Sequence, residues 1–248
     1  MTLPVGTCCP SSDDARSPCY LHRFSCISSS VTVAFPLVDD PKTSLLAWTT
    51  TPWTLPSNLA LCVHPDFNYV KICDEERGEN YILLESRLVV LYKDPKKAKI
   101  KKVGLFSGED MRGWRYTPMF EYFTEKVCIA SRSRPTTEAP PYWVALVQYE
   151  DRAFRVLVDT YVTDKDGTGI VHQAPGFGED DHRIALAYDV IGEDEMPPCP
   201  IDDAGRFTNE VPDFAGQYVK VSLLYGIADD VHVLIQLALI TRMLTRKS

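Results

Sequence analysis

Three consecutive threonines, Thr49, Thr50 and Thr51, are residues whose type and spacing could do chemistry. They follow an apolar run and stop at Pro52, so we expect their hydroxyls to leave the end of a strand on both faces. A hydroxyl both donates and accepts hydrogen bonds, so such a strand end can hold an ester carbonyl, a ribose or an attacking water without adding charge. Threonine is also an ordinary strand former, and that structural interpretation stays open.

A second group lies in residues 167–182, where a glycine-containing loop separates His172 from a run of acidic residues. The acidic residues Glu179, Asp180 and Asp181 stand where a helix should begin, and the helix dipole alone would favour them there. A carboxylate at such a loop can also bind the α-ammonium group of an amino acid, and glycines let backbone approach a ligand closely. His172 is either a structural histidine or a functional one.

The elements that must position these residues are mostly strands. Short β-branched and aromatic runs separated by turn residues predict strands at 31–35, 45–49, 59–63, 69–72, 81–84, 154–158 and 169–172. A short helix is expected after Ser86, and helical spacing covers residues 179–190. Many strands and few helices predict a β-rich, barrel-like α/β fold with peripheral helices.

Changes in composition and hydrophobic pattern along the chain predict three regions. Residues 1–30 are rich in serine, proline and cysteine without any period, and we expect an irregular leader there. Residues 31–220 form the main domain, with a proline-containing surface insertion near 125–150. Residues 221–248 are rich in leucine and isoleucine, which favours a helical segment.

The composition narrows the classes of function. A net charge of −8 over 248 residues argues against sequence-blind wrapping of nucleic acid, although a pocket that takes only the end of a strand is still compatible. The 8 cysteines contain no CxxC pair, so we expect reduced thiols in a cytoplasmic protein and no metal site. No secretory signal is recognisable at the start of the sequence.

The two groups of residues together resemble a known family. The string TTTPWTLPSN at 49–58, followed by GTGIVHQAPGFGEDD at 167–181, is similar to the editing domain (connective peptide 1) of isoleucyl-tRNA synthetases, which are class I enzymes. Related leucyl and valyl enzymes carry an arginine in the first motif, where this chain has Pro52-Trp53-Thr54. The HQAP string followed by FG resembles the eukaryotic cytoplasmic branch, and the resemblance covers about residues 31–220.

The resemblance implies a role for each motif residue. Asp181 would bind the α-ammonium group of the misattached amino acid, and Thr49–Thr51 would position the ester and the hydrolytic water. His172 would form the wall that rejects the larger cognate side chain, with catalysis as a general base as the competing role. Trp48 would flank the pocket, and Asn58 would orient the strand or the ribose.

The function implied is hydrolysis of valine from misacylated Val-tRNA(Ile), the proofreading step of an isoleucine–tRNA ligase. The partners would be the 3′ end of the aminoacylated tRNA, its valine moiety and the remainder of a synthetase. Neither the HIGH nor the KMSKS signature of the synthetic core occurs, so we expect no ATP and no other cofactor. The alternative is an inactive fragment that acts only as a tRNA- or synthetase-binding module.

Overall fold

The computed structural model describes residues 30–92, 94–95, 97–131 and 142–219. The expected leader, apart from residue 30, and the expected C-terminal helical segment lie outside these residues. The seven strands predicted from the sequence are all present, and three further strands accompany them. No helix among the described residues is both long enough and apolar enough to cross a membrane.

The larger sheet has five strands in the order β1-β2-β5-β4-β6. Its strands are β1 (Val31–Pro36), β2 (Thr43–Thr49), β4 (Asn68–Asp74), β5 (Glu79–Leu84) and β6 (Ile100–Ser107). Neighbouring strands run antiparallel except β2 and β5, which run parallel. This sheet positions the three consecutive threonines, because Thr49 is the last residue of β2 and Thr50 and Thr51 follow it directly.

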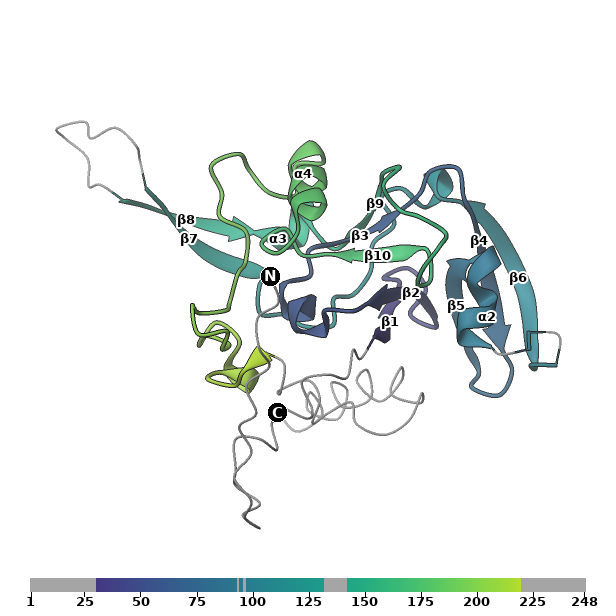
Figure 1. Cartoon of the computed structure of the whole chain (residues 1–248). Coiled ribbons are helices and arrows are strands. Elements are labelled where there is room, and N and C mark those ends of the chain that lie inside the picture. The colour runs from purple at the N-terminus through teal and green to yellow at the C-terminus, as the bar shows by residue number, and fades with distance from the viewer. Residues whose placement is uncertain (1–29, 93, 96, 132–141, 220–248) are drawn as a thin grey trace, which may run out of the picture.

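A second sheet of three strands brings the two motifs together. It consists of β3 (Ala60–Val63), β9 (Arg155–Val158) and β10 (Ile170–Gln173). β3 is the central strand, antiparallel to β10 and parallel to β9, and all four of its residues are fully buried. The register opposes His172 to Leu61. Since β3 follows the threonine motif in the chain, its pairing with β10 places His172 near that motif. Figure 1 shows β3 and β10 side by side.

The expected insertion near 125–150 is largely a β-hairpin. Strands β7 (Glu125–Ser131) and β8 (Tyr142–Gln148) pair antiparallel, and the single turn α3 (Tyr149–Arg152) follows. The hairpin projects from the body of the protein, away from the five-stranded sheet (Figure 1). The sequence interpretation missed these strands because the prolines between them dominated the pattern.

The helices are short and peripheral. They are α2 (Leu88–Leu91), α3 and α4 (Glu179–Ala187), with 3-10 turns η1 (Pro52–Ser57), η2 (Glu85–Arg87), η3 (Glu109–Met111) and η4 (Pro212–Phe214). The expected helix at 179–190 was too long: α4 ends at Ala187, because Asp189 adopts a left-handed backbone with φ of 54°. The turn of α2 follows η2, where a short helix was expected.

The β-rich α/β class expected from the sequence is confirmed, with the described strands arranged in three sheets. The main core lies between the five- and three-stranded sheets and includes Phe35, Leu61 and Tyr116, all at most 1% exposed. Tyr116 meets Phe35 edge to face at 5.2 Å. A smaller core packs Leu88 of α2 against the other face of the larger sheet.

Candidate active site

The two sequence motifs meet at one pocket. A cavity of about 520 Å³ opens where β2 ends, beside β10 and the N-terminal turn of α4. Among its lining residues are six that the sequence had singled out: Trp48, Thr49, Thr50, Thr51, His172 and Asp181. Residues more than a hundred positions apart therefore share one wall.

The threonines form a hydrogen-bonded corner at the end of β2. The Thr51 backbone N–H donates to the Thr49 hydroxyl at 3.0 Å, and the two hydroxyls lie 3.3 Å apart. Thr49 is buried, whereas Thr50 is exposed. The 3-10 turn η1 begins directly afterwards at Pro52, so the chain turns away and leaves the hydroxyls at the pocket.

Thr54, to which the sequence assigned no individual role, connects the corner to His172. Its hydroxyl donates to the Thr51 carbonyl at 2.8 Å and lies 2.9 Å from Nε2 of His172. A hydroxyl has one proton, so in this arrangement Thr54 accepts from an Nε2–H and the ring is in that neutral tautomer. Thr54 belongs to the quoted motif, and its position three residues after Thr51 was the available signal.

His172 is buried and uncharged. Its side chain is 6% exposed, and burial lowers its pKa to about 4, so the ring is neutral near pH 7. Its Nδ1 is covered and makes no hydrogen bond with any described residue. With one nitrogen engaged by Thr54 and the other covered, the ring presents bulk to the pocket and no ready proton acceptor.

Asp181 and Asp180 are adjacent in the sequence but differ in their partners. Asp180 forms an ion pair with Arg183 at 3.1 Å, on the exposed side of α4. Asp181 turns back, and its Oδ2 accepts a hydrogen bond from the Ala174 backbone N–H at 2.9 Å. Burial and, to a smaller extent, the charge of Asp180 raise the pKa of Asp181. Asp181 is thus a desolvated carboxylate at the pocket.

Charge in the pocket has a single sign. The described lining residues include the carboxylates of Asp166 and Asp181 but no lysine or arginine. A ligand with a positive group would therefore meet carboxylate without competition from a lining cation. Within the described part of the chain, we find no group of three or more His, Cys, Asp or Glu residues that could hold a metal ion.

Asn58 lies apart from the pocket lining. Its side chain is buried, donates to the Ala60 carbonyl at 2.9 Å and accepts from the Tyr116 hydroxyl at 2.7 Å. These bonds fasten the start of β3 to the core. Of the two roles expected for Asn58, the geometry favours orientation of the strand over contact with a ribose.

Trp48 flanks the pocket against a glycine. Gly167 has φ of +67°, and a Cβ there would lie 2.8 Å from the Trp48 ring. The absence of a side chain lets the loop before β10 pack on the indole. Further lining residues, to which the sequence assigned no individual role, are Trp53, Tyr161, Val162 and Phe177.

Comparison with known proteins places the chain in a family. No protein-family model matches it. Cytoplasmic isoleucine–tRNA ligase of Saccharomyces cerevisiae is 50% identical over 191 residues, which cover 77% of this chain and 16% of that protein. The cytoplasmic enzyme of Mus musculus is 49% identical, covering 77% of this chain and 13% of the enzyme. The enzyme of Chlamydia muridarum is 41% identical, covering 77% and 16%.

Solved structures give weaker similarities. The crystal structure of GlLeuRS-CP1 is 18% identical, covers 84% of this chain and 81% of that chain, and has a TM-score of 0.45. The cytosolic leucyl-tRNA synthetase editing domain of P. knowlesi is 14% identical, covers 62% and 61%, and has a TM-score of 0.41. The sequence relatives carry the assignment: this chain, which spans 13–16% of their length, belongs to the isoleucine–tRNA ligase family.

Proposed function

We propose that this chain is the editing domain of an isoleucine–tRNA ligase and hydrolyses misacylated Val-tRNA(Ile). The observation that carries the proposal is the meeting of Asp181, His172 and the threonine corner in one pocket. The relatives named above include cytoplasmic enzymes, which agrees with the cytoplasmic location expected from the sequence. Activity, substrate and partners are inferred for this chain from the chemistry of the pocket and from its family.

The substrate's α-ammonium group is the feature that Asp181 would recognise. The carboxylate is partly removed from water, and no lysine or arginine is among the described residues that line the pocket. An ammonium ion at that position would supply the missing positive charge and a charge-assisted hydrogen bond. Because the bound cation favours the ionised carboxylate, binding would lower the pKa of Asp181 that burial has raised.

The threonine corner would position the reacting groups. In the proposed reaction, a water oxygen bonds to the ester carbonyl carbon and the bond to the ribose oxygen breaks. The products are valine and a tRNA whose 3′-terminal hydroxyl has received a proton. Hydroxyls at the end of β2 can hold both the carbonyl and the water, and orientation alone lowers the barrier of an already activated ester. The free ribose hydroxyl next to the ester would assist the proton transfer.

His172 would act as the wall of the pocket. Its low pKa and its bond to Thr54 argue against the general-base alternative, since a base that titrates near pH 4 drives proton abstraction weakly. A rigid, neutral ring would instead exclude the additional methylene of isoleucine. Such a second sieve is useful because a synthetic pocket gains only about 1–3 kcal/mol from one methylene, for which isoleucine against valine is the usual illustration.

Incubation of the purified 248-residue chain with Val-tRNA(Ile) and Ile-tRNA(Ile) tests the proposal. We expect release of valine and retention of isoleucine, with loss of valine release in Asp181→Asn. Asp203→Asn is the matched control, because it removes an exposed carboxylate from a turn outside the pocket. Equal release of both amino acids, or full activity in Asp181→Asn, would contradict the proposal.

A binding-only module is the second candidate, favoured by one observation. The chain spans 16% of the yeast relative, and a segment of that size can bind a partner without carrying out turnover by itself. This candidate predicts no valine release together with measurable retention of tRNA in a filter-binding assay. Turnover of Val-tRNA(Ile) above the uncatalysed rate excludes it.

A further inference from the structure

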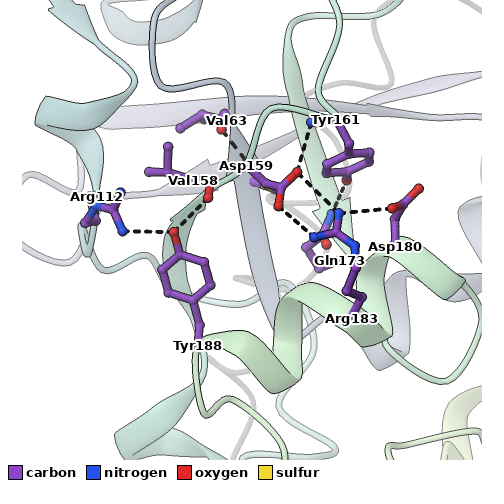
Figure 2. Close-up of polar contacts among 10 residues, drawn as sticks. Val63, Arg112, Val158, Asp159, Tyr161, Gln173, Asp180, Arg183 and Tyr188 are labelled. Carbon is purple, nitrogen blue, oxygen red and sulfur yellow. Dashed lines mark hydrogen bonds and ion pairs between the residues drawn. The ribbon is translucent and has the colours of Figure 1, made fainter.

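Arg183 joins two segments on the outer side of the pocket. Its guanidinium forms an ion pair with Asp159 at 2.9 Å and another with Asp180 at 3.1 Å (Figure 2). Asp159 directly follows β9, whereas Asp180 lies in the first turn of α4. The arginine therefore bridges the N-terminal turn of α4 to the segment that leaves β9.

Asp159 also connects to residues at the pocket through hydrogen bonds. Its Oδ1 accepts from the Tyr161 backbone N–H at 2.9 Å, and the Tyr161 hydroxyl accepts from Gln173 Nε2 at 2.6 Å (Figure 2). Tyr161 lines the cavity, and Gln173 is the last residue of β10. Three separate segments around the pocket are thus connected through Arg183 and Asp159.

We propose that Arg183 is a positioning residue for Asp181: it holds the first turn of α4 against the Tyr161 segment and compensates the charge of Asp180. Asp181 is left as the carboxylate available to a cationic ligand. This inference deepens the proposed function and rests on it for the kinetic test, whereas the titration described below needs no turnover.

Stability of the fold is not the main consequence of this bridge. The Arg183 side chain is 52% exposed, and exposed ion pairs contribute little to the free energy of unfolding. The charge of Asp180 has a more direct effect on Asp181. It raises the pKa of Asp181 in addition to the larger rise that burial causes. Without Arg183, Asp180 would face Asp181 uncompensated, and the pKa of Asp181 would rise further.

None of the other ionisable groups in the described pocket lining is a cation. The pocket lining contributes the exposed Asp166, neutral His172 and Tyr161, whose phenol has its pKa raised by burial. Cys62 of β3 is buried, and burial likewise raises the pKa of its thiol, so it stays protonated. Asp159 is itself paired with Arg183, which holds its pKa low. Arg183 is thus a cation that pairs with both Asp159 and Asp180, the carboxylate next to Asp181 in the chain.

Titration of the Asp181 side-chain carboxyl by carbon NMR tests the proposal on the full chain. In Arg183→Gln, we expect the pKa of Asp181 to rise by about half a pH unit, as for a nearby carboxylate screened by water and salt. Asp180→Asn in the same chain removes that carboxylate and should restore the wild-type value. Arg183→Lys keeps the charge and should shift the titration less than Arg183→Gln.

Arg112→Gln is the matched control. Arg112 is similarly exposed, is bidentate to Glu109 at 2.7 and 2.8 Å, and donates to Tyr188 at the other end of α4 (Figure 2). The Arg112→Gln substitution should loosen the C-terminal end of α4 while leaving the contacts of Asp180 in place. An unchanged Asp181 titration in Arg183→Gln, or an equal shift in Arg112→Gln, would overturn the proposal.

The kinetic consequence follows from the same shift. If ionised Asp181 binds the substrate ammonium, the acid limb of the kcat/KM profile for Val-tRNA hydrolysis should move to higher pH in Arg183→Gln. It should return to its wild-type position in the double variant with Asp180→Asn. At the pH values of this acid limb, most of the loss of kcat/KM in Arg183→Gln should appear as a higher KM. If the wild-type chain releases no valine, the proposed function fails, while the NMR titration still decides the role of Arg183.

Discussion

Nε2 of His172 lies 2.9 Å from the hydroxyl of Thr54, and both side chains are buried. Since the same hydroxyl donates to the Thr51 carbonyl at 2.8 Å, it fixes the tautomer of the ring and the shape of the threonine corner together. The wall and the groups proposed to hold the ester are therefore positioned by one oxygen atom.

Thr54→Val removes that oxygen while nearly keeping the side-chain volume. The buried Nε2–H of His172 then lacks an acceptor, which should lower the free energy of unfolding by about 1–3 kcal/mol. Urea denaturation at pH 7 measures the loss. Thr50→Val, at an exposed threonine of the same motif, should change it by less than about 0.5 kcal/mol. Equal effects in the two variants would mean that the Thr54–His172 bond contributes nothing particular.

His172→Ala distinguishes between the two roles considered for His172, steric exclusion of isoleucine and general-base catalysis. Because the ring has a pKa of about 4 and is neutral above it, valine release between pH 6 and 8 should keep the wild-type pH profile. Hydrolysis of Ile-tRNA should rise about 10–100-fold, the range that one methylene is worth in an apolar pocket. Disappearance of a wild-type titration near neutral pH, with no gain on Ile-tRNA, would instead assign His172 as the base.

Asp181→Asn should stabilise the fold while removing ammonium binding. The folded pKa of Asp181 is raised, chiefly by burial, so the stability that the protonated form contributes is complete below the unfolded pKa. That contribution is lost as pH rises through the folded pKa. The asparagine variant stays neutral and can still accept from Ala174, so its advantage in free energy of unfolding should grow from pH 3.5 to pH 7. Thermal unfolding at both pH values measures this. An advantage that shrinks toward pH 7 would contradict the assigned sign.

Gly178→Ala should displace the Asp181 carboxylate. A Cβ at Gly178 would lie 3.0–3.3 Å from the Asp181 carboxyl atoms, closer than ordinary contact, and the flexible side chain is what can move. We expect kcat/KM for Val-tRNA to fall about tenfold, because small misplacements of a binding group are costly. Gly192→Ala is the control, since its Cβ would meet Glu195 at an ordinary 3.5 Å. Deacylation rates that are the same in both variants would refute the close-packing argument.

The sequence predicted the buried parts of the fold well. The strand ending at Thr49 and the fully buried run around Leu61 have strong β-branched and apolar patterns, which local preference and tertiary packing both favour. β6 was missed because it is an edge strand: Lys101, Lys102 and Val103 are all exposed, so its sequence lacks the apolar pattern of the buried strands.

The candidate site was predicted as a set of residues, and its contacts were not. The motifs identified Asp181 and His172, but only three-dimensional packing distinguishes the paired Asp180 from the desolvated Asp181. Thr54 could not be assigned to His172 from spacing, because the two are 118 positions apart. Asn58 belongs to the quoted motif, yet it binds Tyr116 in the core.

That separation of 118 positions also governs when the pocket can exist during folding. The contact between Thr54 and His172 requires closure of a long loop, whose entropy cost is met only when β10 pairs with β3. A nascent chain that has emerged only as far as β9 contains the residues of the threonine strand but not those of the second wall. Hydrolytic competence would therefore arise in one late step, coupled to the completion of the three-stranded sheet.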